Sequence, residues 1–503
     1  MKTLNMKFSI IMAVCLLFTA CESFLDEPIS KSSSVVPSTI EDLEALIIGD
    51  RDDSMERNYT YIFGTDDYGF DKALVAVKPG AYAISGQIAW GLWDEELMAT
   101  SGDSYWTSEF KRIFVINSVL YYLEEVSGTE EEKKQLSAEA HFWRAYMYFN
   151  LVNTYCLPYS AANLNELGLP LRKTTSFEES LERASLEETY NFIKADLDAA
   201  LTLDVKLEKG FEDKNRTWRA SDAGVNAFAA RFYLAMNDYT NALKYADAAL
   251  ALHSDLVDYN TEMRYSDIDY SVTIQGQTID PQLPYLYDEP SDANKTKWKE
   301  LYVYKFLRNG FAWYSPSEDL LASYDQTNDL RYRYHIVEDY SFVRDVNQDV
   351  NFSRPGYVFF GEEVIASGPT VPEMLLTKAE CEARNGDYNV ALNTVNKLRA
   401  VRMAGNINLT AGSKAEAIGK ILEERRRELP FTSRWMDVRR YNSNDDSSDD
   451  VTITRDFYEY NIGQILEGQN KTYTLEPNSR RFAIPIPEED IVASNGAIKQ
   501  NTY

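Results

Sequence analysis

Few residues in this sequence have the types and spacing that catalysis or metal binding requires. The three histidines, His141, His253 and His335, are isolated, and no HxxxH or HExxH spacing offers a zinc site. No GxSxG nucleophile elbow and no phosphate-binding P-loop occurs. The 79 Asp and Glu residues include adjacent pairs such as Asp66-Asp67, so counting alone leaves room for a glycosidase-like pair of carboxylates. The sequence favours a protein that is not an enzyme and that needs neither a cofactor nor a metal.

The charge balance excludes several classes of partner. The chain has 503 residues, with 51 Lys and Arg against 79 Asp and Glu, which gives a net charge of -28. Such an excess of negative charge disfavours nucleic acid, whose phosphates must be neutralised by Lys and Arg, and it disfavours anionic lipid surfaces. The apolar fraction of 44% is ordinary for a globular protein with a large core.

The first residues have the pattern of an export signal that ends at a cysteine. After two lysines, the 13 residues from Phe8 to Ala20 are nearly all apolar, a run too short for a typical membrane-spanning helix of about 20 residues. Cys21 follows directly, and the junction resembles a bacterial lipobox, in which the cysteine becomes the lipidated first residue. The alternative is an ordinary signal peptide beside an unrelated cysteine. We predict a lipoprotein signal peptide over residues 1–20 and a flexible tether over residues 21–40.

Two cysteines remain once Cys15 leaves with the signal and Cys21 carries lipid. Cys156 and Cys381 lie beside or within apolar helical segments. An oxidising compartment would permit one long-range disulfide, but the apolar surroundings favour two separate buried thiols.

The body of the chain is predicted to be helical. Residues 138–155 place apolar side chains around most of a helix, which is typical of a central helix, and residues 186–201 repeat the helical spacing. Residues 230–250 and 379–398 each contain a helix, a short polar turn and a second helix that begins with DYxxAL. The aspartate suits a helix N-terminus, and small residues let antiparallel helices approach closely. These hairpins resemble tetratricopeptide repeats but lack a regular period of 34, so we predict scattered helix pairs within a larger mainly α fold.

A mid-chain segment differs in composition from the rest of the chain, because Pro and Gly residues separate short stretches that are rich in Tyr. We predict a loop-rich aromatic insertion there, with short β-hairpins such as Tyr302–Phe306 and Tyr332–Val337. Residues 442–450 are polar and acidic and are predicted to form an exposed loop. The predicted parts are an N-terminal helical half (41–255), the insertion (256–371) and a C-terminal helical half (372–503), which together form one compact unit (41–503).

The run of Glu and Arg at residues 423–428 has the composition of a functional charge cluster. However, Arg425 shares a helical face with Leu422 and Leu429. We therefore interpret Arg425 as a partly buried structural arginine that is paired with a carboxylate.

Short motifs in a fixed order make the chain resemble the SusD/RagB-like family, the outer-membrane nutrient-binding lipoproteins of Bacteroidetes. The resemblance runs almost end to end, and the sequence departs from the family mainly at Thr432-Ser433, where the family usually has Glu-Gly. The matching residues are Cys21 to Asp26; Trp106 to Phe110 with Ile113 and Asn117; 138–155; Gly168 to Leu171; Ile421, Glu424-Arg425, Glu428-Leu429, Arg434-Trp435, Asp437 and Arg439; and Ile484 to Pro487, Ile491, Asn495 and Gln500-Asn501.

The resemblance implies a SusD-like helical fold and a role at the outer face of the outer membrane. It implies a lipid-anchored, cell-surface protein that captures an oligosaccharide, or another nutrient such as a peptide, and passes it to a SusC-like TonB-dependent transporter. Two other readings stay open: a repeat-based adaptor whose only ligands are proteins, and a surface glycan hydrolase.

The resemblance also suggests where a nutrient would bind. In family members, loops near the early aromatic helix and in the mid-chain insertion form a surface groove. Aromatic rings stack on the apolar C–H faces of sugar rings, while polar side chains fix the hydroxyl groups. The candidate ligand-binding residues are therefore Trp90, Trp93, Tyr285, Tyr287, Trp298, Trp313 and Tyr314. We assign Trp143, Trp218 and Trp435 to structural roles.

Overall fold

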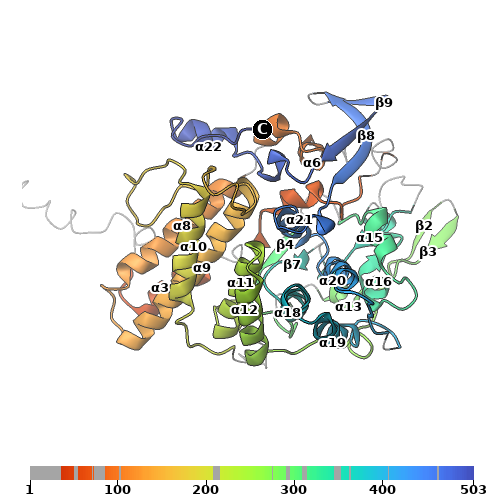
Figure 1. Ribbon diagram of the computed structural model, residues 1–503, viewed down its shortest axis with the longest axis horizontal. Helices are drawn as coiled ribbons and strands as arrows, with labels where there is room; N and C mark the ends of the chain where they lie inside the picture. Colours follow the sequence, from red (N-terminus) through yellow and green to blue (C-terminus); the bar gives the residue numbers. More distant parts are fainter. Residues whose placement is uncertain are drawn as a thin grey trace, which may run out of the picture.

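The computed structural model describes residues 36–49, 55–70, 72, 85–100, 104–207, 216–274, 276–289, 295–308, 314–344, 353–361, 364–405, 407–461 and 464–503. The predicted signal peptide, Cys21 and most of the predicted tether lie outside this part of the chain. The described residues form a mainly helical fold with small sheets, which confirms the predicted fold class (Figure 1). The division into 41–255, 256–371 and 372–503 stays a prediction.

The helices are α3 (Ile40–Ile48), α6 (Ser85–Gly91), α7 (Glu95–Ala99), α8 (Tyr105–Tyr122), α9 (Glu130–Tyr155), α10 (Leu186–Ala200), α11 (Asp222–Ala235), α12 (Tyr239–Leu252), α13 (Tyr285–Asp288), α15 (Glu318–Ser323), α16 (Leu330–His335), α17 (Tyr340–Arg344), α18 (Val371–Asn385), α19 (Tyr388–Arg399), α20 (Lys414–Glu428), α21 (Arg434–Tyr441) and α22 (Glu488–Ala493). Short 3-10 turns are η2 (Tyr59–Gly64), η4 (Ser447–Asp449) and η5 (Arg480–Phe482). The strands are β1 (Met55–Glu56), β2 (Val272–Ile274), β3 (Gln277–Ile279), β4 (Phe306–Arg308), β5 (Ile336–Val337), β6 (Gly356–Tyr357), β7 (Val364–Ala366), β8 (Ile453–Asn461) and β9 (Gln464–Leu475).

Helix α9 is the centre of the N-terminal part. It begins with a capping box, in which the Thr129 side chain accepts from the backbone N–H of Glu132 and the Glu132 side chain accepts from the Thr129 N–H. Its second half, from Ala138 to Tyr155, is buried almost throughout, because α8 and α10 pack along it and α11 also contacts it (Figure 1). The predicted central helix at 138–155 is therefore confirmed.

Two helix hairpins, α11–α12 and α18–α19, form the predicted repeat-like pairs. Asp238 caps α12 by accepting a hydrogen bond from Asn241 N–H, and Asp387 caps α19 by accepting one from Asn389 N–H. The fully buried residues Ala242 and Ala391 lie in the second helix of each pair. Helix α12 packs directly on α18, so the two hairpins are neighbours in space although they lie far apart in the sequence.

The predicted insertion contains a short β-hairpin, formed by β2 and β3, but neither of the two hairpins that were given as examples forms. Residues Tyr302–Phe306 form no hairpin, since β4 lies between β1 and β7 in a three-stranded sheet. Most of Tyr332–Val337 is helix α16, and only Ile336–Val337 is a strand. The longest ribbon, β8–β9, was not predicted, and it projects from the body of the molecule (Figure 1).

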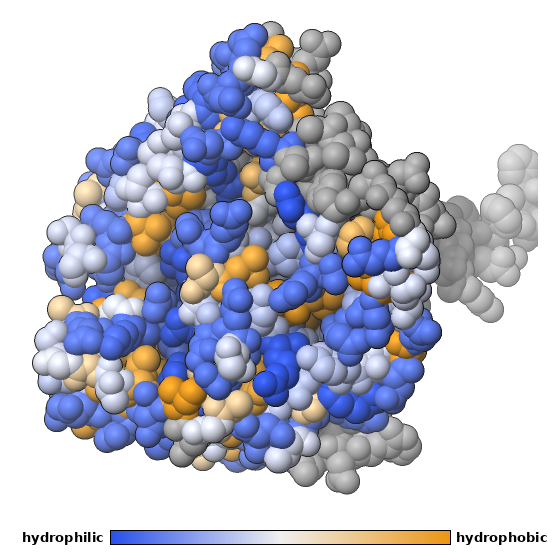
Figure 2. Space-filling view, turned by 90° about the vertical axis from the view of Figure 1, so that its right-hand side faces the viewer, coloured by the Kyte–Doolittle hydropathy of each residue, from blue (hydrophilic) through white to orange (hydrophobic). Residues whose placement is uncertain are grey.

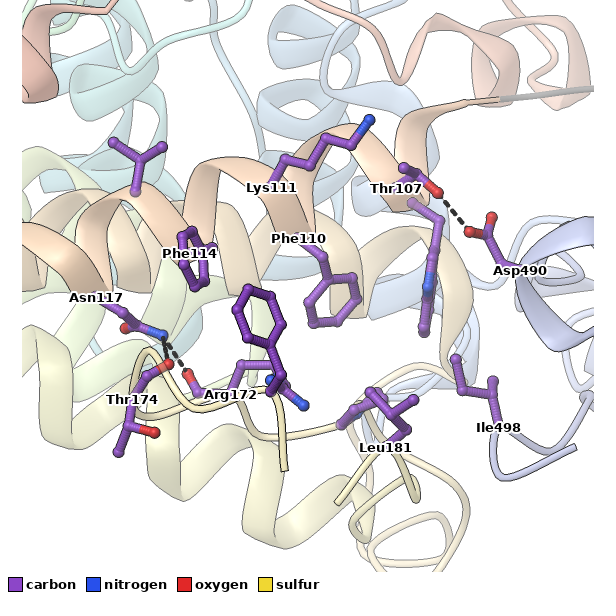
Figure 3. Close-up of a pocket in the computed structure, with 14 residues that line it drawn as sticks. Thr107, Phe110, Lys111, Phe114, Asn117, Arg172, Thr174, Leu181, Asp490 and Ile498 are labelled. Atoms are coloured by element: carbon purple, nitrogen blue, oxygen red, sulfur yellow. Dashed lines mark hydrogen bonds between the residues drawn. The ribbon is translucent and has the colours of Figure 1, made fainter. Parts of the chain in front are cut away.

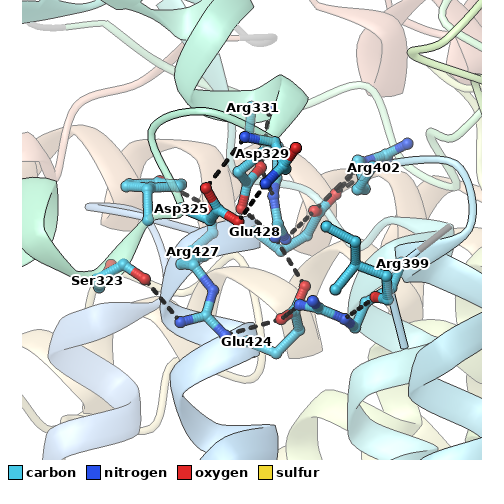
Figure 4. Close-up of polar contacts among 12 residues, drawn as sticks. Ser323, Asp325, Asp329, Arg331, Arg399, Arg402, Glu424, Arg427 and Glu428 are labelled. Atoms are coloured by element: carbon cyan, nitrogen blue, oxygen red, sulfur yellow. Dashed lines mark hydrogen bonds and ion pairs between the residues drawn. The ribbon is translucent and has the colours of Figure 1, made fainter. Parts of the chain in front are cut away.

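A network of buried charges connects the mid-chain segment to α20 (Figure 4). Arg331 of α16 donates to Glu424 and Glu428 of α20 at 2.8 and 2.9 Å. Glu424 also accepts hydrogen bonds from Arg427 at 2.8 Å and from Arg399 of α19. Every one of these charges has a partner, which is the condition under which ionised groups can be buried without a large penalty.

The Glu and Arg side chains of α20 are thus structural. Burial opposes the ionisation of Glu424, but the charges of Arg331, Arg427 and Arg399 hold the pKa of that carboxyl well below its usual range. Arg425 is buried and contacts Asp437 of α21 at 2.8 Å. The interpretation of Arg425 as a buried, carboxylate-paired arginine is confirmed.

Cys156 and Cys381 are both buried and free, so the structure has two separate thiols. None of the helices in the described part is both long enough and apolar enough to cross a membrane. The face on the right of Figure 1 is mostly hydrophilic, with hydrophobic residues in small separate groups (Figure 2).

Replacement of Glu424 by Gln should destabilise the fold. Three buried guanidinium groups would lose their shared negative partner, so we expect the free energy of unfolding to fall by about 3–5 kcal/mol. Since the pKa of Glu424 is lowered by folding, its contribution is present at neutral pH and is lost as the pH falls through the folded-state pKa. The difference in stability between the two proteins should therefore narrow on acidification. Urea denaturation monitored by circular dichroism at several pH values measures both effects.

Glu423→Gln is the matched control, because the Glu423 side chain is 57% exposed whereas that of Glu424 is 0% exposed. We expect the control to change the free energy of unfolding by less than about 1 kcal/mol. Equal effects of the two substitutions would contradict the assignment of Glu424 as the centre of the network.

Candidate functional site

Four of the seven candidate aromatic residues belong to the hydrophobic core. Trp90, Trp93, Trp298 and Tyr314 are all buried, and Trp93 is only 3% exposed. Three of the four use their polar atoms inside the protein: the Trp93 indole donates to the Gly64 carbonyl at 3.0 Å, the Tyr314 hydroxyl donates to the Leu307 carbonyl at 2.9 Å, and the Trp298 indole donates to the Glu300 carboxylate at 3.2 Å. The expectation that these four rings present exposed faces is therefore corrected.

The physical reason lies in the local structure around Trp90 and Trp93. The resemblance places the binding groove on loops near the early aromatic helix, but around Trp90 and Trp93 the chain forms α6 and α7. Trp93 sits at the turn between them with φ of 56° and packs its ring inward. Short helices of this kind are held in place by burying their apolar side chains, which removes those side chains from the surface.

Two of the candidates, Tyr285 and Tyr287, are half-buried on α13. The guanidinium of Arg264 lies 5.4 Å from the Tyr285 ring centre, and the Tyr270 ring packs edge-on against Tyr287. Trp313, like Cys21, lies outside the described residues. Of the tryptophans assigned to structure, Trp143 and Trp435 are buried and Trp218 is partly exposed.

An open pocket lies beside α8, at a place that the candidate residues did not include (Figure 3). Its volume is about 530 Å³, and its surface is mostly apolar. We call it the α8 pocket. It is lined by Trp106, Thr107, Phe110, Lys111, Phe114, Val115, Asn117, Pro170, Arg172, Thr174, Phe177, Leu181, Asp490 and Ile498.

Helix α8 supplies the aromatic wall of this pocket. Trp106, Phe110 and Phe114 are spaced four residues apart, so a helix places their rings one above the other on the same face. Trp106 is buried and its ring packs edge-on against Tyr155, whereas Phe110 and Phe114 are progressively more exposed. The wall is therefore anchored at one end in the core and open at the other.

The opposite wall is the loop that follows Pro170. Phe177 on this loop is 86% exposed and stacks on Phe114, with 5.5 Å between ring centres and 24° between ring planes. Arg172 shapes the loop by donating to the carbonyls of Ser176 at 2.7 Å and Glu179 at 2.9 Å. The two phenylalanines thus form an exposed aromatic pair at the mouth of the pocket.

A buried polar chain ties this loop to the helices. The Asn117 amide donates to the carbonyls of Arg172 and Thr174, each at 3.1 Å, and its oxygen accepts from Arg144 at 2.8 Å. Arg144 in turn pairs with Asp196 of α10 at 2.7 Å. Burial opposes the ionisation of Asp196, but hydrogen bonds from Arg144 and His141 lower its pKa. The position of the loop is thus fixed from the central helix outward.

Three of the polar side chains that line the pocket, Thr107, Lys111 and Asp490, lie at one edge, whereas Asn117, Arg172 and Thr174 lie toward the other end (Figure 3). Thr107 donates to the carboxylate of Asp490, and Lys111 lies on the next turn of α8 (Figure 3). Burial raises the pKa of Asp490 above its ordinary value. Among the described residues that line the pocket, Asp490 is the only carboxylate. The pair of carboxylates that glycoside hydrolysis uses is therefore not found at this site.

The α8 pocket suits binding rather than chemistry. Its exposed rings can cover the apolar face of a flat ligand, and its polar edge can hold hydroxyl or charged groups. Throughout the described part of the chain, no group of three or more His, Cys, Asp and Glu side chains is placed to hold a metal ion.

The fold and the pocket define a class of protein: a mainly helical protein with repeat-like helix pairs and an open, aromatic-lined pocket. Comparison with known families makes this specific. Residues 27–234 match a family model described as SusD-like, starch-binding and associating with the outer membrane, and residues 371–503 match the model of the SusD family. The chain belongs to the SusD/RagB-like family. No curated protein sequence matches it.

Solved structures show the same fold over nearly the whole chain. A putative sugar-binding protein from Bacteroides vulgatus is 18% identical, with a TM-score of 0.65 over 93% of this chain and 99% of the other. A SusD superfamily protein from Bacteroides thetaiotaomicron is also 18% identical, with a TM-score of 0.61 over 92% and 100%. A SusD-like protein described as laminarin-binding is 16% identical, with a TM-score of 0.53 over 91% and 97%.

Replacement of Trp93 by Ala should test the burial of that ring. Because the side chain fills the core, we expect the free energy of unfolding to fall by about 3–5 kcal/mol. Thermal and urea denaturation provide the measurement. Trp218→Ala is the control, since this tryptophan is 36% exposed and should cost much less. A Trp93→Ala protein with unchanged stability and lost ligand binding would show instead that the ring faces a ligand.

Proposed function

We propose that this protein is a cell-surface lipoprotein that captures a nutrient oligosaccharide, and that the α8 pocket is a place where the sugar binds. The observation that carries the proposal is the exposed aromatic pair of Phe114 and Phe177 at the mouth of an open pocket, within a SusD-family fold. The descriptions of its structural neighbours as sugar-binding and laminarin-binding support the same class of ligand.

The chemistry of the pocket supports a ring-shaped amphipathic ligand. Pyranose rings have apolar C–H faces that gain from contact with aromatic rings, and a phenylalanine that covers about 40 Å² contributes about 1 kcal/mol. A few such contacts give only weak binding, in the millimolar to high-micromolar range. Weak capture is useful where a neighbouring protein receives the ligand at a high effective concentration.

The resemblance of the chain to its family supports the remaining parts of the proposal. Lipid on Cys21 would anchor the protein to the outer membrane, facing the cell exterior, and a SusC-like TonB-dependent transporter would receive the ligand. Tyr285 and Tyr287 of α13 form a second candidate surface for the same ligand, and Trp313 stays a predicted ligand-binding residue.

Isothermal titration against a panel of neutral and acidic glycans, with peptides as a second panel, tests the function. Binding of at least one glycan at millimolar or lower concentration is the expected result. Binding of no glycan, together with a stable complex with the transporter, would favour a protein–protein adaptor. Release of reducing ends from any polysaccharide would favour a glycan hydrolase and would contradict the assignment as a binding protein.

Replacement of Phe177 by Ala should weaken glycan binding without affecting the fold. The exposed ring contributes little to the core, and its loss should lower the affinity about fivefold, which corresponds to about 1 kcal/mol. Titration with the best glycan of the panel measures the affinity, and the melting temperature reports on the fold.

Tyr121→Ala provides the matched control for this substitution. Tyr121 is an exposed aromatic residue near the other end of α8 and does not line the pocket. The Tyr121→Ala protein should bind the glycan as tightly as the unmodified protein does. If Phe177→Ala and Tyr121→Ala bind equally well, the α8 pocket is not where the sugar binds.

A further inference from the structure

The charges that line the α8 pocket differ from those of the chain as a whole. The chain has a net charge of -28, but the described lining of this pocket has two cations, Lys111 and Arg172, against the single carboxylate of Asp490. A second pocket, of about 350 Å³ between α3 and α9, follows the general trend. Its lining contains five glutamates against three basic residues: Glu41, Glu44, Glu131, Glu132 and Glu139 against Lys206, Arg216 and Arg219. The α8 pocket is thus the one of the two that an anion can enter without meeting an excess of carboxylates.

Of the two cations, only Lys111 is available to a ligand. Arg172 is used by the protein, since it donates to two loop carbonyls and lies 3.5 Å from the Glu179 carboxylate. Lys111 is exposed, and no hydrogen bond or ion pair joins its ammonium group to another described residue, although its charge is near enough to Asp490 to act on that carboxylate. Its position on α8 lies between Thr107 and Phe114, next to the aromatic wall (Figure 3).

The carboxylate of Asp490 is less available than this ammonium group. One of its oxygens accepts the hydrogen bond of Thr107, and the other is buried without a partner among the described residues. Asp490 is only partly exposed, whereas Lys111 is exposed. The ammonium group of Lys111 is therefore the more exposed of the two charges at this edge of the pocket.

On the basis of the proposed function, we propose that the sugar bound in the α8 pocket is acidic, an oligosaccharide whose rings carry carboxylate groups. The C–H face of one ring lies on the aromatic wall of Phe110 and Phe114, and its carboxylate pairs with the Lys111 ammonium group. Because Lys111 is exposed, water partly screens this pair, so its contribution to affinity is modest, about fivefold. The long-range repulsion of an acidic protein for an anionic ligand makes this local cation a determinant of specificity.

The experiment compares each acidic oligosaccharide with its own neutral derivative. Oligomers of galacturonate, glucuronate and mannuronate are titrated into the full-length protein as they are and after chemical reduction of their carboxyl groups, which keeps the ring but removes the charge. We expect at least one acidic oligomer to bind at least about fivefold more tightly than its reduced form, as one favourable charge pair would give.

Lys111→Met then assigns the effect to the pocket. Methionine keeps most of the aliphatic length but removes the charge, so the acidic oligomer should lose about fivefold in affinity while the reduced form is unaffected. For the unmodified protein, the ratio of the affinity for the acidic oligomer to that for its reduced form should shrink as the NaCl concentration is raised, because salt screens the pair of Lys111 and the ligand carboxylate. Lys134→Met is the matched control, as Lys134 is an exposed lysine on α9 that lies outside the pocket.

The possible results separate this inference from the proposed function. If neutral glycans bind as tightly as acidic ones, the acidic specificity is wrong although the protein still binds glycans. If an acidic oligomer binds but Lys111→Met and Lys134→Met have equal effects, the assignment to Lys111 is wrong. If the folded protein binds no glycan, neutral or acidic, the proposed function fails together with the inference.

Discussion

The pairing of buried charges determines how distant segments of this chain fit together. Arg331, Arg399 and Arg427 come from three different helices, and all of them use the carboxylate of Glu424. A buried ion without a partner is strongly unfavourable, so α20 has few positions against its neighbours in which its charges are satisfied. Hydrophobic contact alone would tolerate small shifts of one helix along another. The charge network therefore adds specificity to a core that apolar packing has already brought together.

The same kind of constraint operates at the α8 pocket on a smaller scale. Asp196 orients Arg144, Arg144 orients Asn117, and Asn117 holds the backbone of the loop that carries Phe177. An exposed aromatic side chain would otherwise be free to fold back onto the protein surface, since water disfavours its exposure. Because the loop is fixed from within, the ring is held open and pre-organised, and a ligand pays little additional conformational entropy on binding.

Local patterns in the sequence predicted the helical parts of this fold well, because their signals are contained in short stretches. Asp238 and Asp387 cap their helices as the DYxxAL pattern suggests, and the apolar circumference of 138–155 is typical of the buried helix that it forms. The sequence did not predict the β8–β9 ribbon, because its two strands pair with each other and only part of their side chains, such as Phe457, pack against the core. Trp93 was misassigned because the amino-acid composition around an aromatic residue is the same whether its ring faces water or the core.

The candidate site depends on exposure, which is the property that composition reports least well. Aromatic residues make up 13% of this chain, and most of those in the described part support the core, so their number does not locate a binding surface. Phe177 carries a clearer signal, as it is the only apolar residue in the polar stretch from Arg172 to Ser180. A single aromatic side chain in such a stretch has no apolar neighbours with which to form a local cluster. Its ring must either reach a distant partner or remain exposed, and Phe177 does both, because it stacks on Phe114 and leaves its other face to the solvent.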